Sequence, residues 1–196
     1  MFRNFELTFT AECSDFLQKI YSDAKYIVEY GSGGSTLLAA KLNKHIITVE
    51  SCVEWLVELM GSYKENDYPG NIVPIWANIG KTGNWGYPID QNAWKKWKEY
   101  SILPWRYCLE HEMDPDVVLI DGRFRVSCFI STCIYIKKKT LIIFDDFVDR
   151  KNYHVILGIA KPKKIIENRM AVFWVEPGMV NSQFLLDSLL DYFNPE

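Results

Sequence analysis

The stretch that decides the fold is Tyr26-Ile27-Val28-Glu29-Tyr30-Gly31-Ser32-Gly33-Gly34-Ser35-Thr36. Its first five residues have the apolar and aromatic composition of a strand, and a helix is predicted to follow over residues 36–42. Glycines at a strand-to-helix turn allow a sharp bend and let a ligand lie against the backbone. The unpaired N–H groups at the start of the helix would point at that ligand. The stretch therefore predicts a ligand-binding turn.

The rest of the chain alternates between predicted strands and helices, which is typical of a parallel sheet covered on both faces. Further strands are predicted at residues 45–49, 72–76, 117–120, 140–144, 164–166 and 171–175, and further helices at 10–23, 124–137, 151–160 and 181–193. Pro74 cannot donate to a neighbouring strand, so its strand should lie at an edge. We expect an α/β, Rossmann-like fold, with a mostly parallel seven-stranded sheet and a C-terminal antiparallel hairpin.

The segment at about residues 77–114 differs in kind, because Trp85, Trp94, Trp97 and Trp105 stand there among glycines, prolines and charged residues. It is longer than a usual connection between strands. We predict a loop with one short helix near residues 92–100, inserted into a single domain that spans residues 1–196. Three interpretations stay open: a lid over the ligand, an accessory hydrophobic layer, or a contact between two copies in a homodimer.

Composition narrows the class of partner. The 196 residues carry a formal net charge of −3, which argues against nucleic acid because phosphate contacts need a basic surface. No signal peptide and no apolar run of about 18 residues is found, so we expect no membrane segment. Five cysteines without CxxC spacing favour free thiols in a reducing compartment, and hence a cytoplasmic protein. We expect its partner to be a small-molecule substrate.

Acidic residues follow three of the predicted strands. They are Glu50, Asp121, and Asp145 with Asp146. The carboxyl ends of parallel strands meet at one edge of a sheet, where ligands bind. A carboxylate placed as Glu50 is, after the second strand, accepts hydrogen bonds from ribose hydroxyls in folds of this kind. For Asp121, a turn or a helix cap is the competing interpretation.

These features resemble the class I S-adenosylmethionine-dependent methyltransferases. The resemblance rests on Glu29-Tyr30-Gly31-Ser32-Gly33, on Glu50, on Asp116-Val117-Val118-Leu119-Ile120-Asp121 and on the terminal hairpin. It covers most of the chain, and the aromatic segment is the chief departure. The stretches Asp121-Gly122-Arg123-Phe124-Arg125 and Phe144-Asp145-Asp146 are similar to a small bacterial subfamily described only as methyltransferase-like.

The resemblance implies S-adenosylmethionine as the cofactor, with the glycine turn at its amino-acid end and Glu50 at its ribose. In the family, an acidic residue often follows the third strand and contacts the adenine, and Asn78-Ile79 hold that place in this chain. The residues expected to bind the cofactor are Glu29, Tyr30, Gly31, Ser32, Gly33, Ser35, Thr36, Glu50, Ser51, Asn78, Ile79 and Asp121.

Methyl transfer to a small, anionic molecule is the function that we predict. Asp121, Asp145 and Asp146 are the candidate general bases, needed only where the acceptor loses a proton. The same three aspartates resemble the magnesium site of catechol O-methyltransferase-like enzymes. A magnesium site is therefore an alternative interpretation. We favour a site without a metal ion.

Two arginines and one tryptophan are candidates for contact with the substrate. Arg123 and Arg125 directly follow Asp121 and would bind a carboxylate or phosphate, or else pair with neighbouring acids. Trp85 would supply a flat apolar wall. Two other functions stay open: a catalytically inactive module that binds a nucleoside cofactor, and an NAD-dependent oxidoreductase, which shares the glycine turn and the acid after the second strand.

Overall fold

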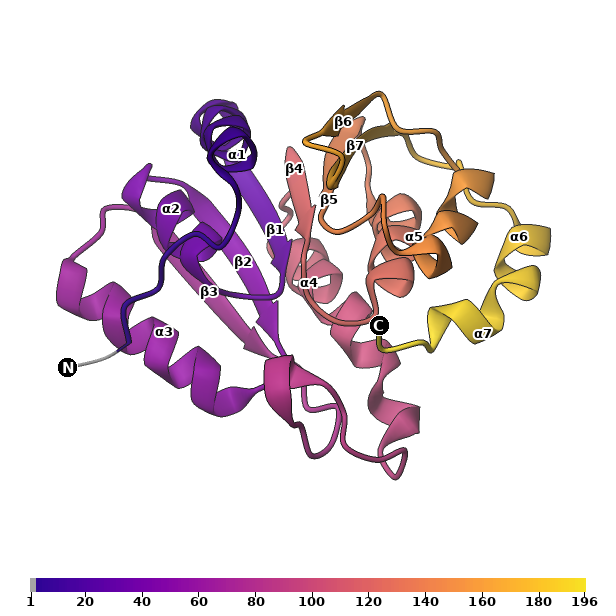
Figure 1. Ribbon diagram of the computed structural model, residues 1–196, viewed down its shortest axis with the longest axis horizontal. Coiled ribbons are helices and arrows are strands. Elements are labelled where there is room, and N and C mark those ends of the chain that lie inside the picture. Colours follow the sequence, from indigo (N-terminus) through magenta and orange to yellow (C-terminus); the bar gives the residue numbers. More distant parts are fainter. Residues whose placement is uncertain (1–2) are drawn as a thin grey trace.

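Seven strands form one sheet in the order β3-β2-β1-β4-β5-β7-β6 in a computed structural model, which describes residues 3–196 (Figure 1). The strands are β1 (Tyr26–Tyr30), β2 (His45–Glu50), β3 (Asn71–Trp76), β4 (Val117–Ile120), β5 (Thr140–Phe144), β6 (Lys164–Ile166) and β7 (Met170–Val175). Strands β1 to β5 are parallel, whereas β7 is antiparallel to both β5 and β6. The predicted fold class is confirmed.

Helices cover both faces of the sheet. They are α1 (Ala11–Asp23), α2 (Gly34–Lys41), α3 (Val53–Asn66), α4 (Lys98–Glu110), α5 (Arg125–Tyr135), α6 (Ser182–Asp187) and α7 (Leu189–Tyr192), with the 3-10 helices η1 (Asn84–Gly86), η2 (Trp94–Lys96) and η3 (Lys151–Gly158). Successive strand side chains point to opposite faces. Ile27 accordingly packs into the core that contains Leu17 and Leu59, and Val28 into the core that contains Trp105 and Phe129.

Pro74 lies where its chemistry predicts. Strand β3 is at the edge of the sheet and pairs only with β2, with Pro74 opposite Thr48. An edge strand tolerates proline because one side of the strand needs no N–H donors. Next to β3 and β2 in the sheet, β1 lies between β2 and β4. The three strands β2, β1 and β4 therefore end side by side.

The aromatic segment is more regular than predicted. The expected short helix at residues 92–100 is replaced by η2 and by the thirteen-residue helix α4, which extends to Glu110. The helix contains Pro104, and Tyr100, Trp105 and Cys108 are all buried against the sheet and α5. Burial of these large side chains offsets the hydrogen bond that the proline removes. The irregular part is therefore limited to about residues 77–97.

The C-terminal region also differs from the prediction. The helix expected at residues 181–193 is divided into α6 and α7 at Ser188, and the one expected at 151–160 is the 3-10 helix η3. The hydroxyl groups of Tyr192, Ser101 and Ser131 lie within 3.0–3.1 Å of one another, which fixes α7 over α4 and α5. Within residues 3–196, none of the helices has both the length and the apolar character needed to span a bilayer.

Candidate functional site

A cavity of about 900 Å³ opens where β1, β2 and β4 end, a volume suited to a small-molecule ligand. Its walls come from the N-terminal segment, the turn after β1, the residues after β2, the loop before α4 and the turn after β4. The lining residues are Arg3, Asn4, Phe5, Glu6, Leu7, Thr8, Phe9, Gly31, Ser32, Gly33, Gly34, Ser35, Glu50, Cys52, Trp55, Gly83, Asn84, Trp85, Gly86, Tyr100, Asp121, Gly122 and Arg123.

The floor of the cavity is the glycine turn after β1. Gly31 has a φ of +92°, and a Cβ atom there would lie 2.7 Å from the Cα atom of Gly122. Its N–H group donates to the carbonyl oxygen of Val49 at 2.9 Å. Glycine alone combines this positive φ with the close approach to Gly122. The turns after β1 and β4 therefore pack directly against each other.

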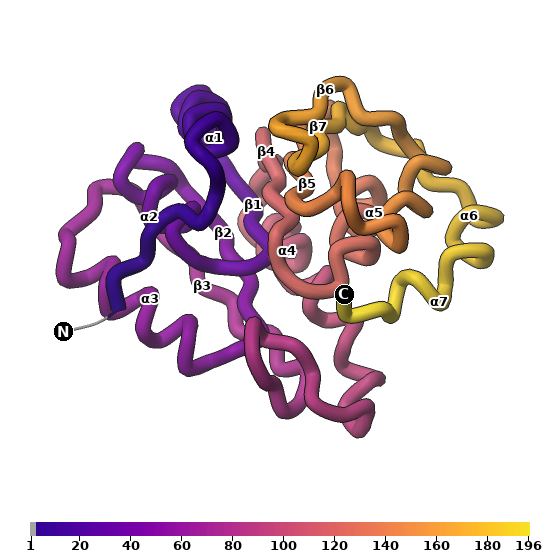
Figure 2. The backbone as a smooth tube through the Cα atoms, viewed as in Figure 1, coloured from indigo at the N-terminus to yellow at the C-terminus, as the bar shows by residue number. Residues whose placement is uncertain are grey.

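The N-terminal segment and Trp55 hold the turn from the side, and the sequence analysis missed both. Figure 2 shows the chain running past α3 and α2 before it enters α1. Phe5 packs edge-on against Trp55 with ring centroids 4.9 Å apart. The Trp55 Nε1–H group donates to the carbonyl oxygen of Ser32 at 2.7 Å. A large aromatic residue five positions after Glu50 was the available signal.

Glu50 is fixed at the cavity by backbone donors. Its Oε1 atom accepts hydrogen bonds from the N–H groups of Ser51 at 2.7 Å and Cys52 at 2.9 Å, and Oε2 accepts one from Ser32 at 3.3 Å. Burial raises the pKa of the carboxyl group, and these donors partly oppose that shift. Within residues 3–196, no cationic side chain pairs with it. The hydroxyl groups of Ser51 and Ser32 also lie 3.2 Å from Oε1 and 3.5 Å from Oε2. A ligand's hydroxyl groups can take the place of these two longer contacts.

Glu29 lies beneath the turn rather than on the cavity. It is fully buried and accepts hydrogen bonds from the hydroxyl groups of Ser35 and Thr36, the latter at 2.6 Å. Burial raises the pKa of Glu29 to about 8, although both hydroxyl groups lower it. Thr36 also accepts from the N–H group of Gly33 at 2.9 Å. Glu29 and Thr36 thus hold the turn onto α2, and neither lines the cavity, although the sequence placed both among the residues expected to bind the cofactor.

Tyr30, Asn78 and Ile79 do not line the cavity. The Tyr30 hydroxyl group lies in the core, where it donates to the carbonyl oxygen of Ser101 at 2.7 Å. Asn78 is exposed and accepts from the N–H group of Gly80 at 3.2 Å, while Ile79 is buried. The tip of the loop before α4, residues 83–86, lines the cavity instead, and the Ser51 hydroxyl group donates to the carbonyl oxygen of Gly86 at 2.9 Å.

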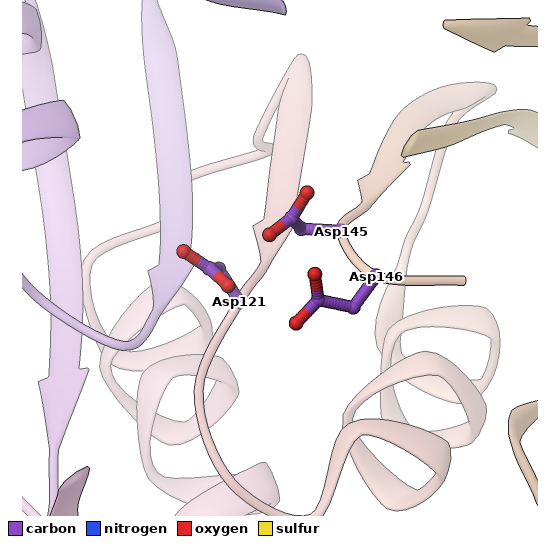
Figure 3. A group of neighbouring side chains, drawn as sticks. All are labelled: Asp121, Asp145 and Asp146. Atoms are coloured by element: carbon purple, nitrogen blue, oxygen red, sulfur yellow. The ribbon is translucent and has the colours of Figure 1, made fainter. Parts of the chain in front are cut away.

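The three aspartates after β4 and β5 face one another (Figure 3), with one carboxylate oxygen from each lying within 4.8 Å of the others. Of the three, only Asp121 lines the cavity. Burial raises the pKa of Asp121 to about 7; Arg125 opposes this shift, and the charges of Asp145 and Asp146 add to it. The candidate bases are therefore not equivalent, because Asp145 and Asp146 lie behind Asp121.

Three arginines neutralise these carboxylates. The shortest contacts are 2.6 Å from Arg169 to Asp145, 3.0 Å from Arg150 to Asp146 and 3.1 Å from Arg125 to Asp121. Three positive charges thus balance three negative ones. A divalent cation needs carboxylate oxygens that are free to coordinate. The donor set of this site does not fit the magnesium ion considered from the sequence.

Arg125 and Arg123 have different environments. Arg125 is 3% exposed, and its guanidinium donates to the backbone carbonyl oxygens of Gly122, Asp121 and Asp145. Arg125 also forms ion pairs with Asp121 and Asp146, which agrees with the second of the two interpretations left open by the sequence. Arg123 lines the cavity, and within residues 3–196 it forms no ion pair and its buried Nε atom has no hydrogen-bond partner.

Comparison with known proteins identifies the family. No family model and no curated protein matches the chain. A methyltransferase-like protein from Silicibacter pomeroyi is 34% identical, with a TM-score of 0.90, and the match covers 98% of this chain and 99% of that one.

More distant structures share the fold. An O-methyltransferase from Bacillus cereus, solved in complex with S-adenosylhomocysteine, is 15% identical over 86% of this chain and 82% of that one, with a TM-score of 0.54. An O-methyltransferase from Streptomyces achromogenes that is involved in tomaymycin synthesis, solved with S-adenosylmethionine, is 12% identical over 88% and 82%, with a TM-score of 0.55. The chain has the fold of the class I S-adenosylmethionine-dependent methyltransferases and belongs to the methyltransferase-like family that the Silicibacter pomeroyi protein represents.

Proposed function

We propose that this protein binds S-adenosylmethionine and transfers its methyl group to a small, anionic molecule. The observation that carries the proposal is Glu50, a carboxylate that N–H and hydroxyl groups hold without a cationic partner among residues 3–196. It lies at the wall of the cavity of about 900 Å³, beside the glycine turn. The Bacillus cereus and Streptomyces achromogenes proteins, which have the same fold, hold S-adenosylhomocysteine and S-adenosylmethionine.

The cavity residues fit this cofactor. Glu50 would accept hydrogen bonds from the two ribose hydroxyl groups, which a carboxylate with free lone pairs can do. Gly31, Ser32 and Gly33 would lie along the amino-acid end, because all three line the cavity and a Cβ atom at Gly33 would meet nothing within 4 Å. When bound, the sulfonium group supplies an electrophilic methyl carbon. The task of the protein is then to align the acceptor with that carbon and to exclude water.

Arg123 supports an anionic acceptor. It is a cation on the cavity wall without an ion-pair partner among residues 3–196, and its Nε–H group is buried and unpaired. An unpaired buried donor costs about 1–3 kcal/mol, so a carboxylate or phosphate that accepts from it would bind favourably.

Asp121 supports proton removal from the acceptor. It lies on the same cavity, and burial raises its pKa to about 7, close to the pH at which a general base is most effective. As the acceptor's nucleophilic atom bonds to the methyl carbon and the carbon–sulfur bond breaks, the acceptor's proton would pass to the Asp121 carboxylate. The electron pair of the broken bond stays on sulfur.

Isothermal titration with S-adenosylmethionine, S-adenosylhomocysteine and NAD tests the proposal. We expect the first two to bind, and Glu50→Ala to weaken both about 100-fold, since two hydrogen bonds to a charged group are lost. Glu54→Ala is the matched control, because Glu54 is exposed on α3 outside the cavity lining. Circular dichroism checks that both variants fold.

The other results discriminate among the alternatives. If NAD binds and neither sulfur compound does, the oxidoreductase interpretation replaces this one. If S-adenosylmethionine binds equally well to wild type and Glu50→Ala, the proposed site is wrong. If it binds at Glu50 but no methyl transfer to any of a panel of small carboxylates and phosphates is detected, the protein is a binding module.

A further inference from the structure

A second hollow of the molecule lies between α3 and β3, which pack side by side at the outer edge of the sheet (Figure 1). It has a volume of about 650 Å³, and none of its lining residues belongs to the cavity at Glu50. Its apolar walls are Val53, Val57 and Met60 from α3 and Pro74 and Trp76 from β3. We call it the α3–β3 groove.

The apolar side chains of this groove are uncovered. Val57 is 61% exposed and Trp76 is 45% exposed. The Trp76 Nε1–H group donates to the carbonyl oxygen of Ser51 at 3.1 Å, and the Ser51 hydroxyl group bonds to Gly86, so the apolar surface continues to the loop tip that carries the exposed Trp85. Contiguous apolar surface with aromatic residues and methionine is typical of a protein–protein contact.

The backbone of β3 excludes one way of covering the groove, which is the addition of a further strand. The Asn71 N–H group donates to the carbonyl oxygen of Lys44 at 2.9 Å, and that of Ala77 to Glu50 at 2.8 Å, so the odd-numbered residues of β3 face β2. The even-numbered residues face outward, and the middle one, Pro74, has no N–H group. An occupant therefore binds through side chains rather than as an added strand.

The charges of the groove favour a second copy of the same chain as the occupant. Lys64 and Glu65 are the only charged residues of its lining, and both are exposed. Within residues 3–196, neither forms an ion pair. In a symmetric dimer the same surface of each copy meets that of the other. A two-fold axis at the groove can therefore bring Lys64 of one copy beside Glu65 of the other, and the reverse.

We propose that the α3–β3 groove is the contact between two copies of this chain related by a two-fold axis. Val57 and Trp76 of each copy pack against the groove of the other, which removes the same apolar surface from water twice. The two reciprocal pairs of Lys64 and Glu65 fix the register. A strongly acidic or strongly basic partner would leave one of these two charges opposite a like charge. The contact does not depend on the cofactor, because no groove residue lines the cavity.

Light scattering after gel filtration of the full chain, over a range of protein concentrations, tests the contact. We expect twice the mass of one chain for the wild type. Val57→Glu places a charge in the apolar contact and should raise the Kd of the dimer at least about 30-fold. Ile134→Glu is the matched control, because Ile134 is 49% exposed on another helix, α5, outside the groove. This control should stay dimeric, and circular dichroism checks that both variants fold.

A charge exchange tests the register. Lys64→Glu would put two acids beside each other at both reciprocal pairs, and should raise the Kd of the dimer about 10-fold. The double variant Lys64→Glu with Glu65→Lys restores opposite charges and should recover the Kd of the wild type. A role of Lys64 within its own chain would not be rescued in this way.

The other outcomes overturn the proposal. A wild type that stays monomeric at every concentration leaves the groove to a partner of another kind. If Val57→Glu is as dimeric as Ile134→Glu, the copies meet at a different surface. If Lys64→Glu weakens the dimer and the double variant is no better, the two-fold pairing is wrong. None of these results bears on the binding of S-adenosylmethionine, which is measured separately.

Discussion

The ends of β2 and β5 carry acids at the same edge of one sheet, but the two ends differ in what surrounds the carboxylates. Glu50, after β2, is held by backbone N–H groups and faces the cavity. Asp145, after β5, is fully buried and bonded through both oxygens to Arg169. A carboxylate held by N–H groups keeps acceptor capacity for a ligand, whereas one paired with a guanidinium joins two parts of the chain. Of these two acids, the one on the cavity is therefore the one without an ion-pair partner among residues 3–196.

Removing Arg169 should have the largest effect. Arg169→Leu leaves the buried Asp145 charge without its bidentate partner, and breaking such a pair costs about 3–5 kcal/mol. We expect the free energy of unfolding, measured by urea titration, to fall by that amount. The double variant Asp145→Asn with Arg169→Leu should recover part of it, because the uncompensated charge is gone.

The control for this variant is an exposed pair. Arg106 and Glu99 are joined on the surface of α4 with Arg106 about half exposed, so Arg106→Leu should change stability by less than about 1 kcal/mol. An Arg169→Leu effect as small as that of Arg106→Leu would show that the guanidinium is not what holds the β5 end.

Two glycines of the turn after β1 should respond differently to the same substitution. Gly31→Ala places a Cβ atom 2.7 Å from Gly122 at a φ of +92°, and should cost about 1–3 kcal/mol. A Cβ atom at Gly33 meets nothing within 4 Å, so Gly33→Ala should leave thermal unfolding nearly unchanged. Equal shifts in the two melting temperatures would contradict the close packing between the turns after β1 and β4.

Glu29 predicts a dependence of stability on pH. Its pKa is about 8 in the folded protein, against an ordinary value of 4.5. Between these two values the folded state binds more protons, so stability falls as the pH rises, by at most about 1.4 kcal/mol per pH unit. Urea unfolding of wild type and Glu29→Gln between pH 5 and about pH 8 should show a smaller decline for the variant. Parallel curves would mean that Glu29 is already ionised at pH 5.

Magnesium should have the smallest effect. Because three arginines balance Asp121, Asp145 and Asp146, the melting temperature should not change when millimolar MgCl₂ is added, with or without S-adenosylhomocysteine. A bound ion raises the melting temperature by mass action. A clear rise would show that the cation displaces a guanidinium, and the account of the β5 end would then be wrong.

The sequence predicts what depends on local pattern. Each strand was located to within one residue. The inner strands β1, β2, β4 and β5 are mostly buried and read as apolar runs between polar turns. Gly31 and Glu50 could be placed at the same edge because both follow parallel strands. The helix after residue 100 was missed because Pro104 is a local breaker and the burial of Trp105 depends on distant residues.

What the sequence could not predict depends on contacts between distant segments. The pair between Arg169 and Asp145 joins the turn between β6 and β7 to the residue that follows β5, and nothing near Asp145 in the sequence signals it. The N-terminal wall of the cavity and the anchoring role of Trp55 arise in the same way. Asn78 lies outside the cavity lining, whereas residues 83–86 of the following loop belong to it. The path of this loop depends on distant contacts and not on local composition.

The most direct test of the central claim is a crystal structure of the complex with S-adenosylhomocysteine. We expect both ribose hydroxyl groups to lie about 2.6–3.0 Å from the Glu50 carboxylate, with the Arg169–Asp145 pair intact. A ligand whose hydroxyl groups instead meet Asp145 or Asp146, or one bound outside the cavity, would contradict the division between the β2 and β5 ends of the sheet.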